Sequence, residues 1–300
     1  MAKFINPLTD IGFKRIFGDK LIMLSFLNSL FEGEFVIKDL EYLDKEQEAL
    51  PGDERNVIYD LFCKTETGME FIVEMQGRSQ VFFRDRILYY LSRALAGQGL
   101  RGADWNYKLT PVYGVYLMNF SLSGDEQIID DVSLYSKCQL GKGVNAKPFS
   151  DKIRVITIDM RAFNKKESNC KTTLEQWIYN IKNMEDMSTM PFKDKNYIFE
   201  HLETLSDYYA MEPDVRKLYD SALRRSRDYY STIESAKVEG RAEGRAEGRA
   251  EGRAEGRAEG ISEGRQRASY ELAKKLILRG MSSEEVSELT GLPLDVIAQL

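Results

Sequence analysis

Two neighbouring segments, residues 57–65 (VIYDLFCKT) and 69–76 (MEFIVEMQ), alternate between apolar and polar positions with a period of two. Thr67-Gly68 lies between them as a turn signal, so the pattern predicts two half-buried antiparallel strands joined in a hairpin. A turn centred near Thr67 places Asp60 directly across from Glu74, with Gln76 two residues further along the same face. Because a slip of one residue would move every side chain to the other face, this register decides which side chains meet.

The predicted hairpin therefore holds two acids and an amide together on one face. The opposite face receives apolar side chains from both strands: Tyr59, Leu61, Cys63, Phe71, Val73 and Met75. Two neighbouring carboxylates repel one another, and burying them is costly unless a cation lies between them. Mg²⁺ suits such a pair, because it takes carboxylate oxygens and keeps several waters for substrate phosphates. The alternative is a solvated sheet face on which the acids are ordinary surface residues.

The patterns around the hairpin predict a mixed α/β domain followed by helices. We expect a helix over residues 10–30, a strand over 36–43, a basic helix directly after the hairpin, and strands over 111–120, 132–140 and 153–159. From about residue 172 to 230 the chain is expected to be helical, with boundary signals at Met, Pro and Asp. This order predicts a central mixed sheet flanked by helices, with an all-helical C-terminal extension.

The segment after the hairpin is strongly basic: residues 78–101 carry five arginines and the single acid Asp85. Arg86, Tyr90 and Arg93 are spaced by four and three residues and so share one helical face. Together with Arg84 they could neutralise backbone phosphates and stack on or hydrogen-bond to nucleotides. A nucleic-acid partner is compatible with the net charge of −6, because the distribution of charge matters more than its sum. The alternative is an amphipathic helix with a solvated basic face.

Composition narrows the class of protein. The three cysteines, Cys63, Cys138 and Cys170, are widely spaced and odd in number, which argues against a disulfide framework and fits a reducing cytoplasm. The N-terminal segment lacks the apolar run of a signal peptide, and no apolar stretch approaches the ~20 residues of a membrane-spanning helix, so no membrane partner is expected. The single histidine, His201, excludes zinc sites built on several histidines and HNH-type chemistry.

An ordered set of sequence fragments is similar to one nuclease family. The fragments are NPLTDIGFKRIFG (6–18), VIYD ending at Asp60, VEMQ with Glu74 and Gln76, FFRDRILYYLSRAL (82–95) and TPVYGVYLMNF (110–120). In this order they resemble the Rpn-type recombination-promoting nucleases, which are transposase-type members of the PD-(D/E)XK nuclease superfamily. The similarity covers about residues 4–120 and extends more loosely to the C-terminus.

The resemblance implies a restriction-endonuclease-like fold and a metal-dependent DNA endonuclease. Asp60 and Glu74 would bind Mg²⁺ (or Mn²⁺), and Gln76 would position the attacking water. The superfamily usually has Lys where this chain has Gln76, although forms with Gln occur in the resembled family. The alternative function is therefore a nuclease-fold protein with weak or lost activity that acts as a nucleic-acid-binding or assembly module. A DDE transposase is the third and least favoured function, because it would need three spaced acids in a different strand order, and the sequence does not show them.

Asp10 and Lys14 lie one helical turn apart in the opening fragment. They are auxiliary candidates for the site, with Lys14 in place of the missing catalytic Lys. The alternative is an ordinary ion pair within one helix.

Residues 240–259 are five copies of Gly-Arg-Ala-Glu. In a helix every i,i+4 pair of this repeat joins two residues of the same type, such as Arg with Arg or Glu with Glu. Salt bridges within the chain therefore cannot stabilise the helix. Each glycine costs roughly 0.8–1 kcal/mol relative to alanine. The repeat is predicted to be either a self-associating stalk, in which Arg and Glu pair between chains, or a flexible linker.

The last segment resembles a helix-turn-helix. Ser282 and Glu285 form a capping box, and Gly291 closes the helix that follows. Residues 282–300 contain four acids and no Lys or Arg, so phosphates would repel the second helix. We expect a small packing or oligomerisation unit. The predicted organisation is a nuclease core (1–165), a helical extension (166–235), the repeat (236–265) and the tail (266–300), with DNA and a second copy of the chain as partners.

Overall fold

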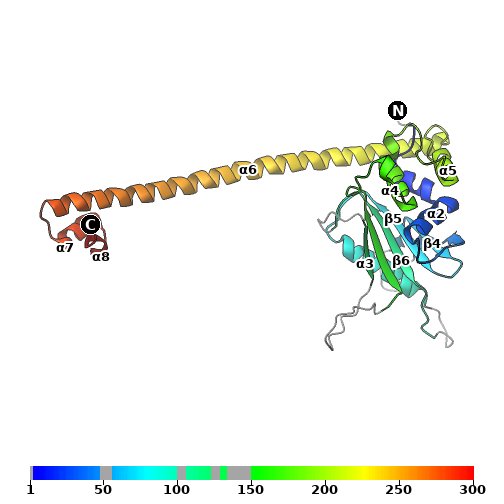
Figure 1. Ribbon diagram of the computed structural model, residues 1–300, viewed down its shortest axis with the longest axis horizontal. Helices are drawn as coiled ribbons and strands as arrows, with labels where there is room; N and C mark the ends of the chain where they lie inside the picture. Colours follow the sequence, from blue (N-terminus) through cyan, green and yellow to red (C-terminus); the bar gives the residue numbers. More distant parts are fainter. Residues whose placement is uncertain (1–2, 48–55, 100–105, 123–128, 134–149) are drawn as a thin grey trace. The chain divides into compact units, whose positions relative to one another are not determined.

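The computed structural model describes residues 3–47, 56–99, 106–122, 129–133 and 150–300 (Figure 1). The helices and strands are, in chain order, α1 (Asp10–Phe17), α2 (Lys20–Leu30), β1 (Leu40–Tyr42), β2 (Glu46–Gln47), β3 (Val57–Ile58), β4 (Leu61–Thr65), β5 (Glu70–Gln76), α3 (Phe83–Gly97), β6 (Val112–Met118), β7 (Ile129–Ser133), β8 (Ile153–Asp159), α4 (Thr173–Asn183), α5 (Tyr197–Ser206), α6 (Pro213–Leu278), α7 (Ser283–Thr290) and α8 (Leu294–Ile297).

Six strands form one mixed sheet in the order β1-β4-β5-β6-β8-β7. The pairs β1/β4, β4/β5 and β7/β8 are antiparallel, whereas β5/β6 and β6/β8 are parallel. The predicted central mixed sheet with flanking helices and a helical C-terminal extension is confirmed. β5 lies inside this sheet, so it pairs on both sides and all seven of its residues are buried.

Helices cover both faces of the sheet. On one face α1, α2, α4 and α5 pack against Phe71, Val73 and Met75 of β5. On the other face α3 packs against Ile72 of β5 and Tyr116 of β6. Figure 1 shows α2 and α3 on opposite sides of the strands. Because β5 alternates between two apolar layers, a polar side chain at an even-numbered position is enclosed under α3.

The predicted helix over residues 10–30 is wrong in one respect, because two helices replace it. α1 ends at Gly18, whose N–H donates to the Lys14 carbonyl, and Asp19 then begins α2. The Asp19 carboxylate accepts from the backbone N–H groups of Leu21 and Ile22 at 3.0 and 3.1 Å. A short acid that caps the next helix favours a new start over continuation.

The hairpin register is confirmed, since Leu61 lies opposite Val73 and Lys64 opposite Glu70. Gly68 supplies the left-handed turn residue, with φ at +85°. The strand before it is shorter than expected, because β3 leaves the hairpin and pairs with β2. Tyr59 consequently packs under α3 and not with Cys63 on the other face, which corrects its predicted position.

The remaining strands follow the prediction to different degrees. β8 covers the predicted range 153–159 and β6 most of 111–120, but β1 covers only 40–42 of the predicted 36–43. The strand predicted over 132–140 is found as β7 at 129–133, and residues 134–140 lie outside the described residues. Cys63 and Cys170 are buried free thiols, and Cys138 lies outside the described residues.

The chain divides into two compact units, Met1–Ser226 and Arg227–Leu300. In the second unit the end of α6 packs with α7 and α8 around Ala273, Val286, Leu292 and Ile297. The predicted capping box is present, and Gly291 ends α7 with φ at +71°. The predicted division at residues 165, 235 and 265 stays a prediction. Within the described part of the chain, no helix combines the length and apolar character that crossing a membrane requires.

Candidate active site

The site is formed where β5 ends beside the start of β4. Glu74 and Gln76 are on β5, and Asp60 directly precedes β4. The hairpin register aligns Leu61 with Val73, so Asp60 falls next to Glu74 when the pairing is extended by one residue. The Asp60 carboxylate is held in place by the backbone of β5, because the Met75 N–H donates to its Oδ2 at 3.2 Å.

Glu74 is an acid in the interior, with its side chain only 1% exposed. Its Oε2 accepts a hydrogen bond from Gln76 Nε2 at 2.9 Å, whereas its Oε1 is buried without a hydrogen-bond partner. Burial raises the pKa of Glu74 to about 8, and the negative charge of Asp60 adds to this shift. Arg86 and the Gln76 hydrogen bond act in the opposite direction. A solvated sheet face, the alternative considered for these acids, is thereby excluded for Glu74.

Two cations flank the carboxylates, each from a different helix. Lys14 of α1 places its Nζ 3.7 Å from Asp60 Oδ1 and 2.5 Å from Asp10 Oδ1. Arg86 of α3 places its Nη2 3.8 Å from Glu74 Oε2. Burial raises the pKa of Asp60, and Lys14 is the largest influence that lowers it. Lys14 therefore forms the expected intrahelical pair with Asp10 and also reaches Asp60.

The four nucleic-acid-binding candidates on α3 have different surroundings. Arg84 is exposed and its Nη2 donates to the Leu122 carbonyl at 3.4 Å. Arg86 lies over the Tyr90 ring, 4.8 Å from its centroid, and both side chains are half-buried. Arg93 is only 8% exposed and faces the interior, because its position on α3 falls on the side that packs against the sheet. This burial does not fit the predicted phosphate contact of Arg93.

Sequence reasoning missed Tyr116, which the sheet places beside the acids. Tyr116 is the partner of Glu74 in the parallel β5/β6 register, and its hydroxyl is buried without a hydrogen-bond partner. Burial raises the pKa of Tyr116 well above its usual value, and the charge of Glu74 adds to the effect. No local pattern identifies this neighbour, because the two residues meet only through the pairing of distant strands.

The donor set fits a divalent cation. Glu74 Oε1 is a buried oxygen without a partner, and Asp60 supplies a second carboxylate close enough to raise the pKa of Glu74. Two carboxylates with completing waters are a usual protein contribution to a Mg²⁺ site. Within the described residues, no group of three or more His, Cys, Asp and Glu side chains could hold a metal ion. A cation here would therefore depend on these two acids, Gln76 and water.

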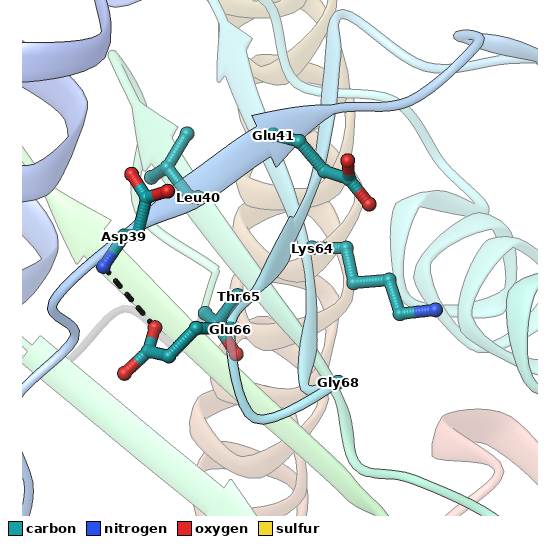
Figure 2. Close-up of a pocket in the computed structure, with 7 residues that line it drawn as sticks. All are labelled: Asp39, Leu40, Glu41, Lys64, Thr65, Glu66 and Gly68. Atoms are coloured by element: carbon teal, nitrogen blue, oxygen red, sulfur yellow. Dashed lines mark hydrogen bonds between the residues drawn. The ribbon is translucent and has the colours of Figure 1, made fainter.

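A separate cavity of about 310 Å³ lies at the turn end of the hairpin (Figure 2). It is lined by Asp39, Leu40, Glu41, Lys64, Thr65, Glu66 and Gly68. The Glu66 carboxylate accepts hydrogen bonds from the backbone N–H groups of Lys38 and Asp39, each at 3.2 Å, so it stabilises the segment that leads into β1. None of the candidate site residues lines this cavity.

Comparison of the sequence with models of known protein families shows which family the chain belongs to. A family model described as PD-(D/E)XK nuclease family transposase matches residues 7–236. The chain belongs to this family. No curated protein and no solved structure matches the chain.

The family match confirms the resemblance and covers Asp60, Glu74, Gln76 and both flanking cations. It supports a nuclease or transposase type of function, and PD-(D/E)XK nucleases generally use divalent metals. The match ends before the first Gly-Arg-Ala-Glu unit at residue 240, so the repeat and the tail lie outside the matched region.

The pKa of Glu74 predicts a pH-dependent stability in the presence of a chelator. The folded protein keeps a proton on Glu74 up to about pH 8, whereas the unfolded chain releases it near the usual value of 4.5. The free energy of unfolding should therefore fall as pH rises from 4.5 to 8, by about 1.4 kcal/mol per unit of pKa difference at most. Thermal denaturation in EDTA should show this fall for wild type and a flatter profile for Glu74→Gln.

Addition of Mg²⁺ at pH 8 provides the control, because an ion that binds the ionised folded site raises the melting temperature. Wild type should gain stability and Glu74→Gln should not. Parallel pH profiles for the two proteins would contradict the buried, proton-holding Glu74.

Proposed function

We propose that this chain is a metal-dependent DNA endonuclease of the recombination-promoting, transposase-related type, which hydrolyses phosphodiester bonds. The observation that carries the proposal is the Glu74 carboxylate, buried beside Asp60 with one oxygen lacking a partner. A fold gains no stability from such a group, because an unsatisfied buried carboxylate costs free energy. Its presence in a nuclease-family chain is explained if it binds a cation.

Asp60 and Glu74 would hold Mg²⁺ (or Mn²⁺). When bound, such an ion lowers the pKa of an attacking water and stabilises negative charge on the scissile phosphate. Gln76 uses its Nε2 to orient Glu74. Its Oε1 is the atom that can accept a hydrogen bond from the attacking water and so position it.

The positive charge that Gln76 lacks is available from the flanking helices. Lys14, held by Asp10, and Arg86, held over Tyr90, both lie within 4 Å of a site carboxylate. Lys14 and Arg86 could each turn to a phosphate oxygen of the substrate once the site carboxylates no longer need their charge. Arg84, exposed at the start of α3, can contact a neighbouring phosphate. We leave Arg93 out of this set because it is buried.

One observation favours a second candidate function. Gln76 cannot supply the charge of the usual Lys, and its amide is already committed to Glu74. If Lys14 and Arg86 do not replace that charge, the chain would act as a nuclease-fold binding or assembly module with weak or lost activity.

We also propose that the chain forms a homo-oligomer through the repeat and the tail. The repeat is part of α6, and residues 231–268 of this helix are all exposed. Within residues 240–259 the structure has no ion pair between side chains, and a glycine recurs every four residues. A solvated helix of this composition is marginal by itself. Association with a second copy would pair Arg with Glu between chains and explain its helicity.

The first test of the proposal is plasmid cleavage. Wild type should cleave with Mg²⁺ or Mn²⁺ and not with EDTA. Asp60→Asn should lose roughly 100-fold or more of this rate, since even the loss of an outer partner of a metal can cost 10–100-fold. In EDTA above pH 8, where Glu74 is ionised, its melting temperature should stay the same or rise, because the repulsion between two neighbouring carboxylates is removed. Gln76→Lys should keep or increase the rate, because it restores a cation near the reacting phosphate.

Gln76→Lys also separates the two functions. A wild type that is inactive with every divalent ion, together with an active Gln76→Lys variant, would favour the binding or assembly module. Cleavage by Asp60→Asn at the wild-type rate would contradict the assigned site.

The second test is the oligomeric state. Sedimentation velocity of the full chain should show an oligomer, and a version ending at Ser235 should be a monomer. Cleavage by the shorter version should be nearly unchanged, because the first compact unit ends at Ser226 and is retained. If both versions are monomers, the repeat is only a linker.

A further inference from the structure

Two large apolar side chains project into solvent next to the candidate active site. Val81 is 93% exposed and Phe82 is 73% exposed, although they follow Gln76 by only five and six residues. Phe83, the next residue, is buried against Tyr116 and Phe120 at centroid distances of 5.8 and 5.4 Å. The chain is therefore anchored at Phe83, and the two preceding side chains are held outside the core.

Phe82 also occupies a position where another residue would stabilise the fold. It is the N-cap of α3, and no side chain caps this helix. Five other helices of the chain, α1, α2, α4, α5 and α7, begin with a side-chain oxygen that accepts a backbone N–H. Ser, Thr, Asp and Asn are the usual N-caps because they satisfy such groups, whereas an apolar residue cannot. Neither packing nor capping explains Phe82.

The surroundings of the exposed pair match a nucleic acid. Arg78 and Arg84 are exposed on either side of it, and Arg86 follows one turn later beside Glu74. An apolar surface bordered by arginines is complementary to bases bordered by phosphates. Arg86 links the exposed pair to the proposed catalytic site, because its backbone N–H donates to the Phe82 carbonyl at 3.0 Å and its Nη2 lies 3.8 Å from Glu74 Oε2. A DNA strand with a phosphate at Arg86 would have neighbouring bases close to Phe82, which lies one helical turn away.

We propose that Val81 and Phe82 contact unpaired bases, so that the preferred substrate is a DNA strand that is single-stranded or unwound at the cleavage site. In a duplex the base faces are stacked on one another and closed to an aromatic side chain. An unpaired base offers its face, and an apolar wedge can also enter an opened base step. This inference rests on the proposed function for its DNA substrate and adds the strand state of that DNA.

Fluorescence anisotropy tests the inference without cleavage. The full chain is titrated, in EDTA and at one salt concentration, into a labelled 20-nucleotide single strand and into the corresponding duplex. Wild type should bind the single strand more tightly. Phe82→Ser should weaken single-strand binding by roughly 5- to 100-fold, the equivalent of about 1–3 kcal/mol for one base stack. Its binding to the duplex should change less than twofold.

Three controls keep this result interpretable. Phe82→Ser supplies a capping residue, so its melting temperature should equal or exceed that of wild type. Phe82→Tyr retains an aromatic ring and should restore single-strand binding. Leu88→Ser removes another exposed apolar side chain of α3, which is 50% exposed, and should leave both affinities unchanged.

Equal affinity of wild type for both DNAs, with no effect of Phe82→Ser, would overturn the inference. If such a protein still cleaves plasmid with Mg²⁺, the proposed function stands and only the strand preference fails. If the chain binds neither the single strand nor the duplex and cleaves no DNA, both the proposed function and this inference are wrong.

Discussion

The burial of one carboxylate, that of Glu74, is the constraint on which the site depends. Glu74 is on the strand that is covered on both faces, so water cannot solvate its charge and its pKa rises to about 8. Asp60 adds a second negative charge. Gln76, Arg86 and Lys14 each offset part of this cost, and none of them satisfies Oε1. A divalent cation would neutralise both acids together, which places metal binding at the centre of the proposed chemistry.

The sheet topology brings these groups together from separate parts of the chain. The antiparallel pairing of β4 with β5 places Asp60 beside Glu74, and the parallel pairing of β6 with β5 places Tyr116 beside it. α1 and α3 belong to different layers, yet each contributes one cation to the same pair of acids. The aromatic packing of Phe83 fixes the start of α3, and so also fixes where Arg86 and the exposed Phe82 lie relative to Glu74.

Much of the site could be predicted from sequence because its central relation is local. The period-two pattern and the turn at Gly68 determine which residues face each other across the hairpin, and the structure has that register. Relations between distant segments could not be predicted. Tyr59 lies on the opposite face of the sheet from the predicted one, because β3 pairs with β2. The burial of Arg93 depends on which side of α3 packs against the sheet. The prediction of one helix over residues 10–30 was wrong for a local reason, because Asp19 caps the start of a second helix.

We propose that the unpartnered oxygen of Glu74 and the carboxylate of Asp60 hold one divalent cation. The most direct measurement is an anomalous difference map from crystals of the protein soaked in Mn²⁺. We expect a peak between the two carboxylates, at about 2.1 Å from an oxygen of each as in Mg²⁺-type coordination, and no peak there in Glu74→Gln crystals. A saturating soak that leaves this position empty, or that places the ion elsewhere, would contradict a metal site formed by Asp60 and Glu74.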